Sequence, residues 1–85
     1  DLDLNNFSPK DSFLKLESEK GKYLYEVEIL NKNILILRIS YDPRWKVYIN
    51  GIEKNIIHVD YLFMGVELDS NSELVLFEFD DSIIK

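Results

Sequence analysis

The stretch Ile39-Ser-Tyr-Asp-Pro-Arg-Trp-Lys-Val-Tyr-Ile-Asn-Gly51 decides how this chain folds. Within it, Asp42-Pro43-Arg44 interrupts a strand pattern, and proline has no N–H to donate to a sheet, so the chain must turn or cross between sheets there. Asn50-Gly51 is the strongest hairpin signal in the sequence, because a type I′ turn needs positive φ at both central residues. The stretch therefore predicts a strand, a corner, a second strand and a hairpin turn.

Outside this stretch, apolar and polar residues also alternate with a period of two, which indicates half-buried strands rather than helices. Turn formers separate these runs, and Gly21 is expected to take a left-handed conformation in one of the turns. We expect residues 1–12 to be an irregular lead-in. The predicted fold is a single all-β domain over residues 1–85, a small antiparallel β-sandwich of six to seven strands with jelly-roll or immunoglobulin-like topology. The strands are expected at residues 13–17, 23–30, 34–41, 45–49, 52–59, 62–68 and 73–79.

Composition limits what this domain can bind. With 85 residues, of which 46% are hydrophobic, the chain can bury one core but not two. The 16 acidic and 10 basic residues give a net charge of -6, which argues against nucleic acid and anionic membrane surfaces as partners. There is no cysteine, so no disulfide stabilises the fold. No apolar run reaches the length of about 20 residues that spans a bilayer.

Catalytic and metal-binding residues are sparse in the sequence. His58 is the only histidine, and no spaced cluster of carboxylates accompanies it, so we interpret it as an ordinary strand residue. The aspartates do not form a calcium-loop pattern and are interpreted as solvated turn residues. We therefore expect a domain that is not an enzyme and has neither a metal nor a cofactor.

Four aromatic residues are candidates for ligand or interface contact: Trp45, Tyr48, Tyr61 and Phe63. Sugar-binding sandwiches display such rings as flat platforms. Trp45 is in phase with Val47 on its strand, which favours a place in the core over a platform. Tyr48 lies on the opposite face of that strand and Tyr61 lies near a bend, which favours contact with a ligand or another domain for these two.

Residues 39–79 resemble the C-terminal extracytoplasmic domain of YfhO-type bacterial membrane proteins. The family pattern is approximately Tyr-x-Pro-Gly-Trp followed by a turn Asp-Gly, then Asn-x-x-Phe-x-Gly-Val-x-Leu and a closing aromatic strand. Arg44 departs from the usual glycine, Asn50 from the turn aspartate and Tyr61 from the asparagine, and residues 70–72 replace a Pro/Gly turn. The matching residues are Tyr41, Pro43, Trp45, Gly51, Phe63, Gly65, Val66, Leu68 and Phe77.

The resemblance implies that this domain is part of a larger polytopic membrane protein with glycosyltransferase C-type architecture. Such proteins are similar to enzymes that transfer lipid-linked sugars to cell-envelope polymers such as teichoic acid. Catalysis would then lie in the membrane part, and this domain would be a non-catalytic accessory on the extracytoplasmic face of the bacterial membrane. It would bind the parent transmembrane domain, a glycan or an envelope polymer. An independent carbohydrate-binding module and a protein-interaction or spacer domain are the alternatives.

Overall fold

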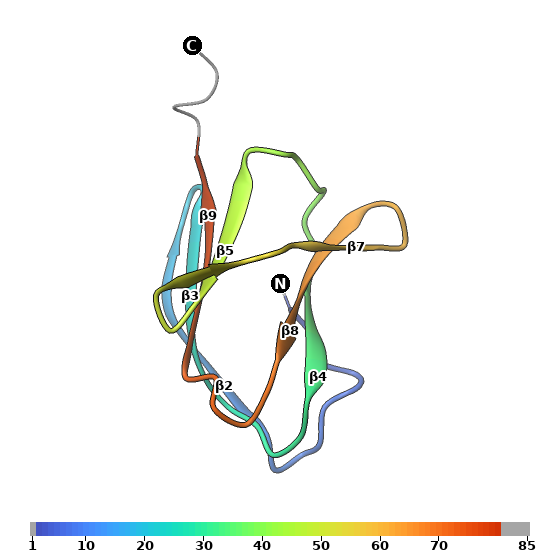
Figure 1. Cartoon of the computed structure of the whole chain (residues 1–85), viewed down its shortest axis with the longest axis vertical. Coiled ribbons are helices and arrows are strands. Elements are labelled where there is room, and N and C mark those ends of the chain that lie inside the picture. Colours follow the sequence, from blue (N-terminus) through green and yellow to red (C-terminus); the bar gives the residue numbers. More distant parts are fainter. Residues whose placement is uncertain (1, 81–85) are drawn as a thin grey trace.

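The computed structural model describes residues 2–80, which form two antiparallel sheets packed face to face (Figure 1). The four-stranded sheet has the order β1-β4-β8-β7, and the five-stranded sheet has the order β2-β3-β9-β5-β6. No helix occurs in this described part. The strands are β1 (Leu2–Asp3), β2 (Ser12–Glu19), β3 (Lys22–Glu28), β4 (Asn33–Leu37), β5 (Trp45–Ile49), β6 (Ile52–Lys54), β7 (Ile57–Val59), β8 (Phe63–Leu68) and β9 (Leu74–Phe79).

The predicted all-β antiparallel sandwich is confirmed. Every strand pairs antiparallel with its neighbours, and alternate residues of each central strand face the other sheet. On β3, for example, Tyr25 and Val27 point inward, and Tyr25 lies opposite Val75 of β9. The core consists of Tyr25, Val27, Ile29, Leu35, Leu37, Val47, Ile49, Met64, Val66, Leu68, Val75 and Phe77.

The turn chemistry read from the sequence is also confirmed. Gly21 has a φ of 79°, and Asn50 and Gly51 have φ values of 53° and 83°, as a type I′ hairpin between β5 and β6 requires. The segment around Pro43 connects β4 of one sheet with β5 of the other. The chain therefore crosses between sheets where proline interrupts the strand pattern.

Residues 52–59 do not form one strand, as the sequence predicted, but two. β6 pairs with β5, whereas β7 pairs with β8 of the opposite sheet, so the chain between them crosses the open side of the sandwich (Figure 1). Two consecutive short strands in different sheets leave the same apolar pattern as one longer strand. The structure consequently has nine strands in its described part instead of six to seven, because the lead-in also contributes β1.

The lead-in is less irregular than expected, because Leu2 of β1 pairs with Leu37 of β4. Two residues are too short to show a periodicity. β4 is in turn shorter than predicted and ends at Leu37, where Ile39 N donates to Leu37 O at 2.8 Å and bends the chain. The strand β1 depends on a contact with β4, which is distant in the sequence. The early end of β4 depends on a bend that no single residue in the sequence indicates.

One core side chain carries an unsatisfied polar group. Tyr25 is 2% exposed, and its hydroxyl has no hydrogen-bond partner among residues 2–80. Burial raises the pKa of Tyr25, and the nearby Tyr23 adds to this shift.

We expect Tyr25→Phe to stabilise the domain by about 1 kcal/mol, because it removes a buried polar group that costs about 1–3 kcal/mol. Urea unfolding would measure this, with Tyr23→Phe as the control; a less stable Tyr25→Phe variant would contradict the prediction.

Candidate binding surfaces

Trp45 lies at the margin of the core rather than on a surface. Its half-buried ring stacks on Tyr23 with centroids 6.1 Å apart and meets the edge of Phe79 at 5.3 Å. The side chain faces inward with Val47, as its phase on the strand predicted. These contacts fit a packing role, because ring surface that is covered by Tyr23 and Phe79 is not available for stacking on a flat ligand.

The corner before Trp45 is fixed by an ion pair. The Asp42 carboxylate accepts hydrogen bonds from Arg44 Nε and Nη2, both at 2.8 Å, and from the Arg44 backbone N at 2.9 Å. The side-chain bonds and then the backbone bond lower the pKa of Asp42 to about 2. The Arg44 guanidinium also lies 4.7 Å from the Phe79 ring centre. Arg44 therefore has a structural role at the position where the YfhO pattern has glycine.

Tyr48 lies on the outer face of the five-stranded sheet, opposite to Trp45. It is half-buried, and its neighbours across the sheet are Leu76 of β9 and Glu53 of β6. Together with Leu24 and Leu74 it lines a shallow hollow of about 310 Å³. The hollow is lined mainly by apolar side chains on an open sheet surface, so Tyr48 is suited to contact with a flat surface.

Tyr61 occupies the tip of the β7–β8 hairpin and is fully exposed, at 102%. Its φ is 64° and that of Asp60 is 52°, which is an unfavourable conformation for a bulky side chain. Backbone bonds hold the tip, because Leu62 N donates to Val59 O at 3.1 Å and Leu62 O accepts from Tyr41 N at 2.7 Å. The Tyr61 ring therefore makes no contribution to the core that would offset the cost of this backbone conformation.

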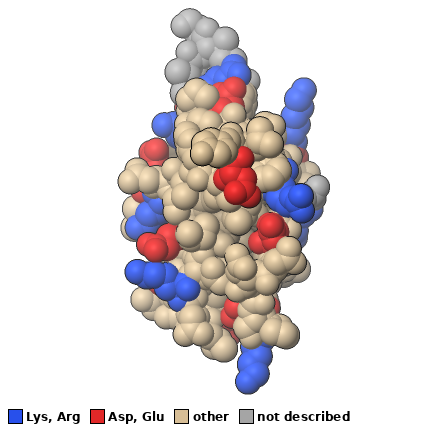
Figure 2. Space-filling view, turned by 90° about the vertical axis from the view of Figure 1, so that its right-hand side faces the viewer, with Lys and Arg blue, Asp and Glu red and all other residues tan. Residues whose placement is uncertain are grey.

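Phe63 lies at the base of the same hairpin, on the outer face of the four-stranded sheet. The register of β4, β8 and β7 places Ile34, Ile36 and Val59 on this face as well. Figure 2 views the molecule from this side: uncharged side chains fill much of the middle, and most charged ones lie toward the margins. We call Ile34, Ile36, Val59 and Phe63 the β4–β8–β7 face.

Gly65 lies in the middle of the β4–β8–β7 face. A Cβ at this position would lie 3.1 Å from a methyl carbon of Ile34 and of Val59, and 3.3 Å from the Leu35 carbonyl oxygen. The absence of a side chain lets Ile34 and Val59 close over β8. Gly65 therefore makes the apolar face continuous across three strands.

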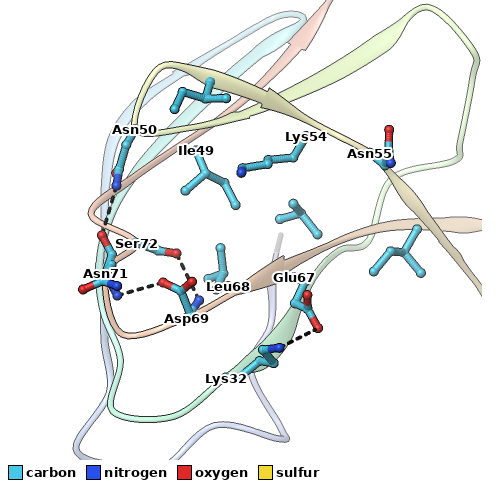
Figure 3. A pocket seen from close by; sticks show the side chains of 13 residues that line it. Lys32, Ile49, Asn50, Lys54, Asn55, Glu67, Leu68, Asp69, Asn71 and Ser72 are labelled. Carbon is cyan, nitrogen blue, oxygen red and sulfur yellow. Dashed lines mark hydrogen bonds and ion pairs between the residues drawn. The ribbon is translucent and has the colours of Figure 1, made fainter.

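A cleft that the sequence did not predict opens between the two sheets beneath the crossing from β6 to β7 (Figure 3). Its volume is about 450 Å³. Its apolar lining combines three buried core residues with the half-buried Ile57 and the exposed Ile52. The lining comes from both sheets and from the 69–72 turn, so only knowledge of the sheet order could have brought these residues together. The polar lining residues are Lys32, Asn50, Lys54, Asn55, Glu67, Asp69, Asn71 and Ser72.

Asn50 connects the two turns at one end of this cleft. Its Oδ1 accepts hydrogen bonds from the backbone N atoms of Glu73 and Leu74, both at 2.9 Å, and its Nδ2 donates to Asn71 O at 3.0 Å. The side chain thus joins the β5–β6 hairpin to the start of β9. This role was not predicted, because the sequence shows Asn50 only as a turn residue.

The remaining polar candidates do not converge. His58 is exposed and its ring lies 4.1 Å from that of Tyr41. Among residues 2–80, no three His, Asp or Glu side chains lie close enough together to hold a metal ion. No helix that could cross a membrane occurs in that range either.

The structure therefore distributes the four aromatic candidates over separate regions: Trp45 at the core margin, Tyr48 on the five-stranded sheet, and Tyr61 and Phe63 on one hairpin. Comparisons of the chain with protein-family models, with curated proteins and with solved structures found no match. The resemblance to YfhO-type domains accordingly stays a prediction.

Proposed function

We propose that this domain is a non-catalytic accessory domain of a YfhO-like membrane glycosyltransferase that acts on cell-envelope polymers. In this role it lies on the extracytoplasmic face of the bacterial membrane and docks onto the parent transmembrane domain. Docking holds the domain, and any polymer it contacts, beside the membrane active site. The basis for the family assignment is the motif in residues 39–79.

One observation carries the docking role: the apolar β4–β8–β7 face, extended by the exposed Leu62 and Tyr61 at its hairpin tip. Apolar side chains on a sheet surface lower the solubility of an isolated domain and are typical of contact surfaces. Arg38, whose guanidinium lies 5.6 Å from the Phe63 ring centre, gives this face a polar border. A polar border around an apolar centre is the usual composition of a protein interface.

An independent carbohydrate-binding module is the second candidate. The exposed Tyr61 ring favours it, because an aromatic side chain outside the core can stack on a sugar ring. The two candidates differ in what precedes Asp1. The accessory role requires upstream apolar spans, each of about 20 residues, in the full-length protein; their absence would refute it.

Docking is testable with a matched pair of variants in the full-length protein. Ile34→Asp places a charge on the β4–β8–β7 face, whereas Leu14→Asp places the same charge on the five-stranded sheet, where Leu14 is 57% exposed. We expect Ile34→Asp to reduce polymer glycosylation about tenfold or more, since burying an unpaired charge costs well over 1.4 kcal/mol. Leu14→Asp should leave it unchanged.

Thermal unfolding of the two isolated variants would show that both remain folded. Equal glycosylation by both full-length variants would contradict docking through this face.

A further inference from the structure

The cleft between the sheets has a lysine and an asparagine on one wall and two carboxylates on the other. Lys54 and Asn55 come from the β6 side, and Glu67 and Asp69 come from β8 and the turn after it (Figure 3). Lys54 can only donate hydrogen bonds, whereas the two carboxylates can only accept them. A ligand that bonds to Lys54 must therefore accept there, and one that bonds to Glu67 or Asp69 must donate there, whereas Asn55 can do both.

The charges in the cleft cancel. Lys32 and Lys54 are balanced by Glu67 and Asp69, and Lys32 forms a long ion pair of 3.9 Å with Glu67. A site with balanced charges gives no electrostatic advantage to either an anion or a cation. The chemistry of the walls therefore favours a neutral ligand.

Some of the polar groups are already used by the fold and others are not. Asn50 and Ser72 are bonded to backbone groups, as is one Asp69 oxygen, which accepts from Asn71 N at 2.8 Å. Within residues 2–80, by contrast, Lys54 forms no ion pair and the Asn55 side chain no hydrogen bond. The second Asp69 oxygen is likewise without a side-chain or backbone donor from the described residues. These groups can bind a ligand without breaking a contact of the fold.

Edge protection explains part of this arrangement. Lys54 pairs with Val47 across the hairpin and so faces the inside of the sandwich on an edge strand. An inward-pointing charge discourages another chain from adding to the edge. This accounts for Lys54 but not for Asn55, nor for the carboxylates on the facing wall.

We propose that this cleft binds a neutral polyhydroxylated ligand of the size of a mono- or disaccharide. Hydroxyl groups both donate and accept, so a sugar can bond to both walls, and its C–H groups can lie against the exposed Ile52 and the half-buried Ile57. The volume of about 450 Å³ falls within the range of about 300–1,000 Å³ that is typical of small-molecule sites. The inference goes beyond docking and does not depend on it, because none of Ile34, Ile36, Val59 and Phe63 lines the cleft, although Glu67 at its rim lies opposite Ile34.

Amide NMR shifts of the 85-residue chain would test this, with maltose, lactose and N,N′-diacetylchitobiose as probes. We expect at least one disaccharide to shift the signals of Asn55, Ile57 and Asp69 with a Kd on the order of 1 mM. No shift in the cleft with any of the three at about ten times that concentration would overturn the proposal. Shifts centred on Tyr61 would overturn it too, because they would place sugar binding at the hairpin tip.

Two variants that each remove one negative charge make the test more specific. Glu67→Gln replaces one carboxylate oxygen on the cleft wall by an NH2 donor and removes the negative charge, and Glu53→Gln makes the same change on the outer face of β6. We expect Glu67→Gln to weaken binding about fivefold, the effect of one hydrogen bond, and Glu53→Gln to have no effect. Equal effects would contradict the assignment of the site. Glucose 6-phosphate that binds more than about tenfold tighter than glucose would contradict a neutral ligand.

Discussion

Replacing Trp45 by alanine is expected to lower the free energy of unfolding by about 3 kcal/mol, a large fraction of the stability of a domain of this size. Removal of a buried large aromatic residue typically costs about 3–5 kcal/mol, and the half-buried indole places the expected loss at the lower end. The loss includes the stacking on Tyr23 and the edge contact with Phe79. Urea unfolding followed by circular dichroism would measure it.

Trp45→Phe is the control, because a smaller ring keeps part of both aromatic contacts. We expect it to cost about 1 kcal/mol, which is closer to a conservative core substitution. If Trp45→Ala instead unfolds at the same urea concentration as the original chain, the indole contributes little to packing. Trp45 would then be a candidate platform again, as the sequence alone allowed.

Period-two alternation and turn chemistry were sufficient to predict most of the fold. The inward faces of β3, β5 and β8 follow directly from alternation, because side chains of a strand point to opposite faces in turn. Pro43, Gly21 and Asn50-Gly51 predicted a sheet crossing and two turns, because each restricts the backbone in a way that only a few conformations satisfy.

The sheet order could not be predicted, and the missed features depend on it. The crossing from β6 to β7 shows no proline or glycine, so residues 52–59 resembled one strand although they belong to two sheets. The sequence left jelly-roll and immunoglobulin-like topologies open, and the order of the strands now gives the pairing directly. Pairing is decided by contacts between distant segments, which no local pattern contains.

The sequence identified candidate contact residues only where the alternation within one strand determines the face of the sheet to which each side chain points. The opposite directions of Trp45 and Tyr48 follow from alternation, and both are confirmed. The β4–β8–β7 face and the cleft combine residues from three or more segments. The polar groups of the cleft, such as Asn55, have no motif around them, so only the folded chain identifies them.

Asn50 shows how a turn residue can act beyond its turn. From the sequence alone, its contribution is the tolerance of positive φ that the type I′ turn requires. In the structure its side chain also makes three hydrogen bonds to the chain around β9, at 2.9–3.0 Å. Without these bonds, the β5–β6 hairpin and the turn before β9 are joined through fewer contacts.

Asn50→Ala is therefore expected to lower the free energy of unfolding by about 2–3 kcal/mol. Each of the three exposed hydrogen bonds contributes about 0.5 kcal/mol, the lower end of the usual range, and alanine at a φ of 53° adds a backbone cost of about 1 kcal/mol. Asn50→Gly separates the two causes, because glycine tolerates this φ and lacks only the side-chain bonds, so it should cost about 1–2 kcal/mol. Asn50→Asp keeps the acceptor for Glu73 and Leu74 and should be the mildest of the three. If Asn50→Gly is as stable as the original chain in urea unfolding, the side-chain bonds add no stability and only the turn conformation matters.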